Sequence, residues 1–309
     1  MKTPPILVTG ARGFLGSALV EYFRREGREV VGLSRGRSDG PAGEDGSQVT
    51  DYSVRHLGSL FTDLQPVVVI HAAGGASVPA SIADPKADFA AGPALVANIL
   101  EAVRLTAPTA RLVFLSSAAV YGDPSRLPVD EGEELRPLSP YGHNKAASEA
   151  LCRQYWALHS VPCAIARIFS AYGPGLRRQV VWDLCKKLTS GDEVVRLQGT
   201  GAESRDFIHA RDVAEAIDAI LKNGKFDGTC YNVASGEETT IADLARCLRD
   251  EISPVSELTF DGNLPAGNPT RWCADISALR ALGFSPKVRF RDGLREYARW
   301  FRENASASS

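Results

Sequence analysis

The sequence lacks any excess of charge. Its 35 lysines and arginines are balanced by 37 aspartates and glutamates, which leaves a formal net charge of −2 over 309 residues. A chain this close to neutral has no charge imbalance that would attract nucleic acid or an anionic membrane surface, so we expect neither partner. No apolar run approaches the ~20 residues that a membrane-spanning helix requires. We therefore expect a globular protein that acts on a small molecule.

Cysteine and histidine are scarce and scattered. The six cysteines include no C-x-x-C pair, and the five histidines form no cluster with acidic residues at the spacing of metal ligands. We expect free thiols in a reducing compartment, no metal site and, with no leader pattern at the N-terminus, a cytoplasmic protein. No serine lies in a G-x-S-x-G elbow, which disfavours a hydrolase.

The first half of the chain alternates apolar, β-branched runs with helical patterns. Ile6 to Thr9 is a predicted strand, and Phe14 to Arg25 is a predicted helix with Leu15, Leu19 and Phe23 on one face. Further strands are predicted at 29–33, 67–71, 111–116 and 162–168, and further helices at 94–105 and 141–159. Almost wholly apolar strands that alternate with helices indicate a parallel sheet covered on both faces.

The second half is less regular. Helices are predicted at 180–190, 240–251 and 292–304, and proline and glycine gather at 253–270, which suggests loops. We predict an α/β chain, with a Rossmann-type doubly wound parallel sheet and a smaller mixed α/β C-terminal substrate lobe. The sheet domain is expected to comprise residues 1–171 plus about 206–234, and the lobe about 172–205 and 235–309.

Three evenly spaced glycines follow the first predicted strand. Gly10, Gly13 and Gly16 stand between that strand and the first helix. Glycine lets the backbone turn tightly and approach a pyrophosphate, which then rests on the N–H groups at the helix N-terminus. Any tight strand-to-helix turn can use glycine, but the strand before these residues and the amphipathic helix after them favour a dinucleotide site.

The end of the second strand bears on the choice of cofactor. An NAD site usually places an acidic residue there to bind the ribose 2′-hydroxyl. Here the strand ends in Ser34, followed by Arg35. An acid would repel a 2′-phosphate, whereas serine and arginine can bind it through charge-assisted hydrogen bonds. We therefore favour NADP(H), with NAD(H) as the alternative; the other reading of Arg35 is a solvated loop residue.

Tyr141 and Lys145 stand four residues apart at the start of a predicted helix, so they face the same side. A phenol has a pKa of about 10 and is a poor base near neutrality, but a neighbouring ammonium lowers that pKa. Such a tyrosine can exchange a proton with an alcohol oxygen while hydride moves at its carbon. A surface lysine beside a packed tyrosine would show the same pattern; Ser117, at a strand end upstream, makes the pattern more specific.

These three residues resemble the Ser–Tyr–Lys triad of the extended short-chain dehydrogenase/reductases, in the NAD(P)-dependent sugar-nucleotide epimerase/dehydratase/reductase group. Further motifs carry the resemblance along nearly the whole chain: H-A-A-G at 71–74, S-V-P-A-S at 77–81, R-I-F-S-A-Y-G-P at 167–174, R-D-F-I-H at 205–209, W-C-A-D at 272–275 and L-G-F-S-P at 282–286. The resemblance implies that Ser117 binds the reacting oxygen and that Tyr141 is the acid/base. It also implies that Lys145 tunes Tyr141 and binds the nicotinamide ribose.

The resemblance also implies contacts to both ligands. Cofactor contacts are expected at Gly10, Arg12, Gly13, Phe14, Leu15, Gly16, Ser34, Arg35, Ala72, Ala73, Gly74, Tyr141, Lys145 and Ile168. A nucleoside diphosphate sugar would contact Ser77, Ser117, Ser170, Arg205 and Arg271. Arg205 matches the family arginine that binds the diphosphate; the other reading of Arg205 is a salt bridge to Asp206 or Asp212. Relatives of this group are commonly dimers, so a homodimer is expected.

Several positions depart from the family pattern. The 4,6-dehydratases carry Asp-Glu directly after the catalytic hydroxyl, and Ala118 and Ala119 cannot transfer a proton there, so water elimination is disfavoured. The usual asparagine of the family's R-x-F-N motif is Ser170, and the usual Asn-Val before the leucine-rich helix is Gly-Pro at 92–93. The family usually has a second diphosphate-binding arginine in the loop that corresponds to residues 265–271, and only Arg271 is available there. The sugar pocket should therefore differ from that of common epimerases.

We expect an NADP(H)-dependent enzyme that moves hydride to or from C4 of a nucleoside diphosphate hexose. Net reduction of a 4-keto(-6-deoxy)hexose is favoured, because free NADPH suits an enzyme that exchanges its cofactor at each turnover. The alternative is a C4-type epimerase that keeps its cofactor and returns the hydride to the other face of the sugar. A non-catalytic NADP-binding protein of the same fold is a further reading, against which the retained triad argues.

Overall fold

The computed structural model describes residues 4–35, 47–263 and 269–304 of the chain. A parallel sheet with strand order β10-β6-β5-β4-β1-β2-β3 forms its centre. These strands are β1 (Ile6–Thr9), β2 (Val30–Ser34), β3 (Ser47–Val49), β4 (Val68–His71), β5 (Arg111–Ser117), β6 (Cys163–Ile168) and β10 (Asp227–Val233). The order runs in opposite directions on either side of β1, which creates the crevice where open α/β sheets bind ligands. The predicted Rossmann-type sheet is therefore confirmed.

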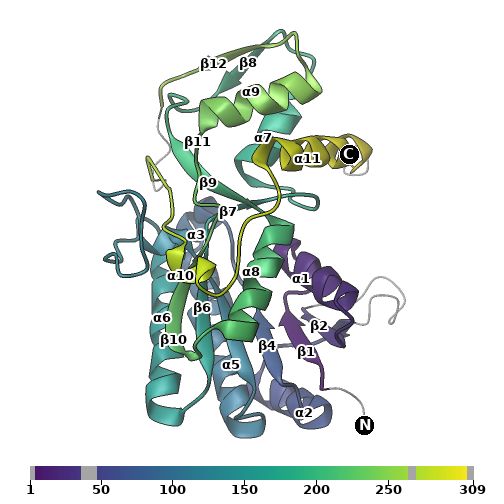
Figure 1. Ribbon diagram of the computed structural model, residues 1–309, viewed down its shortest axis with the longest axis vertical. Helices are drawn as coiled ribbons and strands as arrows, with labels where there is room; N and C mark the ends of the chain where they lie inside the picture. Colours follow the sequence, from purple (N-terminus) through teal and green to yellow (C-terminus); the bar gives the residue numbers. More distant parts are fainter. Residues whose placement is uncertain (1–3, 36–46, 264–268, 305–309) are drawn as a thin grey trace.

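Helices cover both faces of this sheet (Figure 1). They are α1 (Phe14–Arg25) and α8 (Ala210–Asn223) on one face, and α2 (Val54–Leu64), α5 (Pro93–Thr106) and α6 (Pro140–His159) on the other. Side chains alternate along each strand, so Ile6 and Val8 pack with the α1 side while Leu7 packs with α2 and α5. Both faces of the strands are thus buried, which explains their almost wholly apolar sequences.

Two short helices precede α5, namely α3 (Val78–Ala83) and α4 (Pro85–Ala91). Ser77 caps α3 and Asp84 caps α4, each through its side-chain oxygen. Together α4 and α5, Pro85–Thr106, have the length and composition of a membrane span. The α5 part is a core helix, because Ile99, Leu100 and other apolar residues pack against the sheet and α2.

A smaller lobe stands at one end of the sheet domain (Figure 1). Its sheets have the orders β11-β9-β7 and β12-β8, and α7, α9 and α11 pack around a separate apolar core. The bounds are β7 (Ser170–Tyr172), α7 (Gln179–Leu188), β8 (Val194–Leu197), β9 (Ser204–His209), β11 (Glu238–Thr240), α9 (Ile241–Ile252), β12 (Glu257–Phe260) and α11 (Phe290–Asn304). The loop predicted over 253–270 therefore contains a strand, β12, which pairs in parallel with β8.

The chain crosses between the two parts several times. After β9 it returns to the central sheet through α8 and β10, then re-enters the lobe at β11. Near the C-terminus, α10 (Ser277–Arg280) and the turn after it place Leu279 and Phe284 in the core on the α1 and α8 side of the sheet. This segment, which the sequence assigned to the lobe, is apolar and packs against the sheet domain.

Candidate active site

The glycine loop between β1 and α1 forms a cradle in which side chains have no room. Gly10 has a φ of 68°, and a Cβ there would lie 2.8 Å from the Cα of Ala73. A Cβ on Gly16 would lie 2.0 Å from the carbonyl oxygen of Gly10. Helix α1 starts after Gly13, which offers no side-chain cap, and its first turn has no acidic residue. The loop and the N–H groups of this helix therefore suit a pyrophosphate.

The segment after β4 lies directly beside this cradle. The hydroxyl of Thr9 is 2.7 Å from Nδ1 of His71 and accepts a hydrogen bond of 3.1 Å from the N–H of Ala73. Burial lowers the pKa of His71 to about 3, and the charges of Lys145 and Arg35 act in the same direction. His71 is thus a neutral residue that fixes the segment 72–74, where the sequence predicts backbone contacts with the cofactor.

The end of β2 carries no acidic side chain. Ser34 is buried, and its Oγ has no hydrogen-bond partner among the residues that the structure describes. Arg35 is exposed, and its guanidinium lies 5.6 Å from the ring centre of Tyr52. The hydroxyl of Tyr52 donates to the carbonyl of Leu33 and accepts from the N–H of Gly10, at 2.9 and 3.1 Å. Tyr52, which the sequence did not single out, thus ties the glycine loop to the end of β2.

A cleft of about 610 Å³ runs along α1, from the glycine loop to the last residues of the helix. Its lining includes Arg12, Arg24 and Arg25 together with Ser17 and Gly32. Glu21 also lines the cleft and pairs with Arg25 at 3.1 Å, so the guanidinium groups outnumber the carboxylates and the cleft favours an anionic ligand. Among the predicted cofactor residues, Arg12 therefore lies in a setting that suits a phosphate group.

The predicted catalytic residues meet where β5 ends and α6 begins. Ser117 is the last residue of β5, and its Oγ accepts a hydrogen bond of 3.2 Å from the N–H of Ala119. Tyr141 lies in the first turn of α6 and hydrogen-bonds to Ser117 through its side chain. The N–H of Tyr141 donates to the buried Oγ of Ser81 at 3.1 Å, which ties α6 to α3. The structure thus places the side chains of Ser117 and Tyr141 close enough for Ser117 to lower the pKa of the phenol.

Lys145 lies one helical turn after Tyr141. Its Nζ donates to the carbonyl oxygen of Leu115 at 2.8 Å and lies 5.8 Å from the ring centre of Tyr141. Burial lowers the pKa of Lys145 to about 8, and the carboxylates of Asp88 and Glu149 oppose that shift. The ammonium therefore gains or loses its proton close to neutral pH.

The protonation of Tyr141 differs from the sequence-based expectation. Lys145 was expected to lower the pKa of this phenol, yet burial raises it, and Asp88 adds to the rise. The hydrogen bond with Ser117 and the guanidinium of Arg178 act in the opposite direction. The reason is geometric, since Nζ of Lys145 binds the carbonyl of Leu115 instead of the phenol. In this state Tyr141 is a proton donor, and Arg178 is a charged neighbour that the sequence did not reveal.

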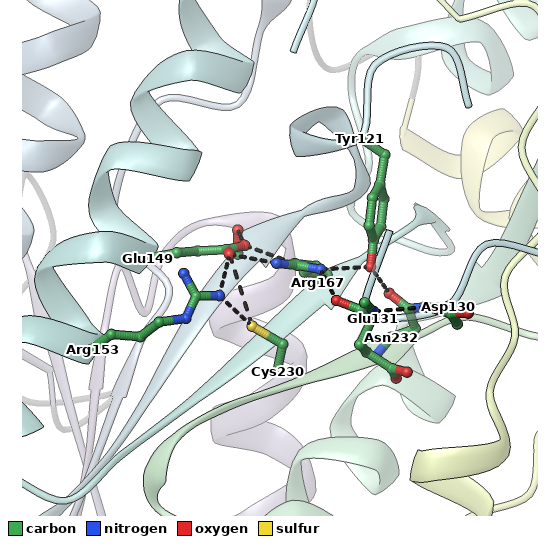
Figure 2. A network of polar contacts seen from close by, with 10 residues as sticks. Tyr121, Asp130, Glu131, Glu149, Arg153, Arg167, Cys230 and Asn232 are labelled. Carbon is green, nitrogen blue, oxygen red and sulfur yellow. Dashed lines mark hydrogen bonds and ion pairs between the residues drawn. The ribbon is translucent and has the colours of Figure 1, made fainter. Parts of the chain in front are cut away.

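A buried polar network holds α6 onto the sheet (Figure 2). The carboxylate of Glu149, also on α6, accepts two hydrogen bonds from Arg167 on β6, at 3.0 and 2.8 Å. It also accepts from the hydroxyl of Ser116 at 2.7 Å and from Arg153 at 3.0 Å. These donors keep the pKa of Glu149 below its usual value although burial acts against them. Because Ser116 precedes Ser117, the network fixes the position of α6 at the catalytic end of β5.

Arg167 extends the same network from β6 through Tyr121 to β10. Figure 2 shows its guanidinium between Glu149 and the hydroxyl of Tyr121, to which it donates at 2.8 Å. Tyr121 donates in turn to Oδ1 of Asn232 at 2.7 Å. Between Ser117 and Tyr121 the chain forms a short 3₁₀ helix, η1 (Ala118–Val120), whose residues are all buried. Apolar packing thus occupies the two positions where dehydratases of the family carry acids.

Arg205 on β9 has no carboxylate hydrogen-bonded to it among the described residues. It donates to the carbonyl of Ser204 at 2.7 Å, and its guanidinium lies 5.5 Å from the ring centre of Trp272. Burial lowers the pKa of Arg205 to about 10. Asp206, one candidate for a salt bridge, instead accepts hydrogen bonds from Ser235, Gly236 and Ala274. The other, Asp212, accepts from the N–H groups of residues 287 and 288. This arrangement leaves a poorly solvated cation suited to an anionic ligand.

The other predicted substrate residues have varied surroundings. Arg271 is exposed and makes two hydrogen bonds with Glu238, at 2.7 and 2.8 Å, so its guanidinium is already engaged. Ser77 accepts from the N–H of Ala80 as the cap of α3. Ser170 is half-buried on β7, two residues after Ile168, which pairs with Ser117 across β5 and β6.

Comparison with known proteins gives consistent matches along the chain. The family model described as "NAD dependent epimerase/dehydratase family" matches residues 6–234. A putative UDP-glucose 4-epimerase of Methanocaldococcus jannaschii is 30% identical over 97% of this chain and 99% of its own length. The structure of a UDP-N-acetylglucosamine 4-epimerase from Methanobrevibacter ruminantium, in complex with UDP-N-acetylmuramic acid, has a TM-score of 0.86 and 26% identity, covering 98% of this chain and 100% of that one. A Thermus thermophilus UDP-glucose 4-epimerase in complex with NAD has a TM-score of 0.85 and 29% identity, covering 96% and 99%.

These comparisons correct one expectation from the sequence. The preference for net reduction of a 4-keto sugar nucleotide is wrong, because proteins similar over nearly the full length are named as UDP-glucose and UDP-N-acetylglucosamine 4-epimerases. That preference depended on Ser34 and Arg35 at the cofactor ribose. Residues there select the cofactor, whereas the fate of the hydride is decided at the sugar, so they could not distinguish reduction from epimerisation.

Proposed function

The chain belongs to the NAD dependent epimerase/dehydratase family of nicotinamide-cofactor enzymes, and on this basis we propose that it is a 4-epimerase of a UDP-sugar. The observation that carries the proposal is the contact between Ser117 and Tyr141, with Lys145 one turn away, in a chain similar to 4-epimerases over its whole length. Epimerisation needs one hydride and one proton to leave the same carbinol and return, and this site offers a single acid/base for that purpose.

Each residue of the site has one task in this scheme. The hydroxyl of Ser117 holds the reacting sugar oxygen. Tyr141 takes the proton of that oxygen as the phenolate and returns it as the phenol. The glycine loop and the N-terminus of α1 would hold the pyrophosphate of the cofactor. The nicotinamide ring of a bound cofactor would supply the hydride acceptor and donor. Apolar Ala118 and Ala119 provide no second acid that would eliminate water. The site therefore directs the chemistry to oxidation and reduction at one carbon.

Arg205 is proposed to bind the diphosphate of the nucleotide sugar. Its guanidinium is half-buried, stacked near Trp272 and without a carboxylate hydrogen-bonded to it among the described residues. A guanidinium presents fixed donors to phosphate oxygens, and the energy of that pairing increases where water is partly excluded.

NADP(H) is proposed as the preferred cofactor, with NAD(H) as the competitor. The support is the absence of an acidic residue at the end of β2, the exposed cation of Arg35 and the arginine-lined cleft that includes Arg12. Separate titrations with NADPH and NADH, followed by cofactor fluorescence, test this preference. Tighter NADPH binding that weakens towards the NADH value in Arg35→Ser supports it, and equal affinities contradict it.

A cytoplasmic homodimer is proposed as the assembled form. Leu105 on α5 and Trp156 and Leu158 on α6 are exposed apolar side chains on neighbouring helices. Their burial against a second copy would remove this apolar surface from water. Sedimentation equilibrium tests the assembly, and a monomer at micromolar concentration contradicts it.

The proposed activity is tested with UDP-glucose, UDP-N-acetylglucosamine and UDP-glucuronic acid as separate substrates. Conversion of one of them to its C4 epimer, with no net change of cofactor absorbance, is the expected result. If a 4-keto sugar consumes the reduced cofactor stoichiometrically while no UDP-sugar is epimerised, the proposal fails.

A further inference from the structure

A carboxylate that the scheme above does not use stands beside the catalytic pair. Asp88 on α4 accepts a hydrogen bond of 2.7 Å from Nδ2 of Asn144 on α6. Both residues line a small cavity together with Tyr141 and Lys145. Asn144 directly precedes Lys145, so the pair bridges α4 to the part of α6 that carries the catalytic side chains.

Two glycines make room for this pair. A Cβ on Gly75 would lie 2.6 Å from Oδ1 of Asp88, which is closer than non-bonded atoms approach. A Cβ on Gly92 would lie 3.1 Å from the carbonyl oxygen of Asp88 and 3.6 Å from Cβ of Asn144. Residue 92 is also where the sequence departs from the asparagine usual in the family. The space in front of Gly92 is therefore bordered by Asn144, which Asp88 holds in place.

Of the two carboxylates that act on Lys145, Asp88 differs from Glu149 in its hydrogen-bond partner. Nζ of Lys145 has the carbonyl of Leu115 as hydrogen-bond partner, and the carboxylates that act on it are Asp88 from α4 and Glu149 from α6. Glu149 is already paired with Arg153 and Arg167, whereas the hydrogen-bond partner of Asp88 is the neutral amide of Asn144. The charge of Asp88 is thus left to act on Lys145.

Other titratable groups that face this pair add little or act elsewhere. Cys152 on α6 acts weakly on Lys145 in the same direction as the carboxylates, and His71 on β4 is neutral because its pKa is far below 7. Arg178, at the start of α7, acts on Tyr141 in the direction opposite to that of Asp88. Among the residues that the structure describes, Asp88 is therefore a carboxylate that acts on both members of the catalytic pair and has an amide, not a guanidinium, hydrogen-bonded to it.

We propose that Asp88, held by Asn144, is a positioning residue that keeps the ammonium of Lys145 charged beside Tyr141. The inference deepens the proposed function and rests on it for the role of the pair in catalysis. Asp88 leads the charged groups that raise the pKa of Lys145, and it also raises the pKa of Tyr141. Removal of its charge lowers both pKa values, because a carboxylate favours the protonated form of each group.

The first test measures Lys145 directly and needs no substrate. Protein labelled with ¹³Cε-lysine is titrated by NMR, and the Lys145 signal is identified by its loss in Lys145→Met. In Asp88→Asn, which keeps the shape and the amide contact, the midpoint of Lys145 is expected to fall by about one pH unit. Asn144→Ala keeps the charge of Asp88 but removes the amide that holds its carboxylate. This variant is expected to give a smaller fall in the Lys145 midpoint. Asp63→Asn, an exposed change on α2, serves as the matched control.

The second test is the pH dependence of turnover. Because both pKa values fall, both limbs of the profile are expected to move to lower pH in Asp88→Asn, with about a tenfold loss above the alkaline limb for a shift of one unit. A Lys145 midpoint equal to that of the wild type overturns the inference, as does a loss of activity that is uniform at every pH. Since the NMR titration does not depend on epimerase activity, failure of the inference is distinguishable from failure of the proposed function.

Discussion

The hydroxyl of Tyr141 is the atom on which the chemistry of the site depends. It hydrogen-bonds to Ser117, and burial raises its pKa, so it holds a proton that can be handed to a sugar oxygen. Tyr141→Phe removes that proton and keeps the ring, so turnover is expected to fall by about 10²–10⁴-fold. Cofactor affinity, measured by fluorescence titration, is expected to stay within about twofold of the wild type. Near-wild-type turnover in this variant overturns the mechanism.

Two arginines at the predicted substrate site have different surroundings and should respond differently to substitution. Arg205→Met removes a cation that has no bound carboxylate among the described residues, and binding of UDP is expected to weaken by roughly 10–100-fold, the value of a charged hydrogen bond. Arg271→Met breaks an exposed pair with Glu238 and is expected to change UDP affinity much less. Isothermal titration with UDP compares the two. Equal losses would show that the diphosphate contacts are assigned wrongly.

At the scale of elements, α6 depends on Glu149 and Arg167 for its anchorage to β6. Both side chains are almost fully buried, at 0% and 2% exposed, and they share two hydrogen bonds. Arg167→Met leaves the carboxylate buried with fewer donors, and the free energy of unfolding is expected to fall by about 3–5 kcal/mol. Urea denaturation measures this fall. In the double variant that also carries Glu149→Gln, part of the stability should return, because no uncompensated charge then remains.

The same pair predicts a pH dependence of stability. The pKa of Glu149 is below its usual value of 4.5, so the folded protein binds the proton of this group less readily than the unfolded chain. The contribution of the Glu149 carboxylate to the free energy of unfolding is therefore complete above about pH 4.5. It disappears as the pH falls through the pKa that Glu149 has in the folded protein. Urea denaturation of the wild type and Glu149→Gln between pH 7 and 3 should show curves that approach each other at the acid end. A difference independent of pH would contradict this assignment.

The elements also show what the sequence can predict. Helix α1 was predicted with its observed bounds, because a glycine loop and an apolar stripe both act over a few residues. Strand β12 was missed, since the strand it pairs with in the described part of the chain, β8, lies some 60 residues away, and Pro and Gly surround it. The Ser–Tyr–Lys triad was predicted from its spacing, whereas Asp88 and Asn144 meet through the packing of α4 on α6. Glu149, four residues after Lys145, was within reach of the same spacing argument.

At the scale of the molecule, the sheet domain and the lobe are joined by several crossings of the chain and not by a single linker. The chain crosses between them around β9, α8, β10 and β11, and Asp206 joins β9 to the backbone of Ser235, Gly236 and Ala274 at the junction. Segments of one part thus cannot unfold without freeing residues that pack in the other. The structure therefore predicts that sheet domain and lobe lose their structure together.

This coupling makes a calorimetric prediction. A single unfolding transition is expected, and a nicotinamide cofactor bound to the sheet domain or UDP bound near Arg205 should each move the whole of it. At a ligand concentration of about 100 Kd the stabilisation is about 2.7 kcal/mol, which for a chain of this size raises the Tm by several degrees. Scanning calorimetry of the protein alone, with NADPH and with UDP separates the cases. Two transitions, of which each ligand moves only one, would show that the lobes unfold independently.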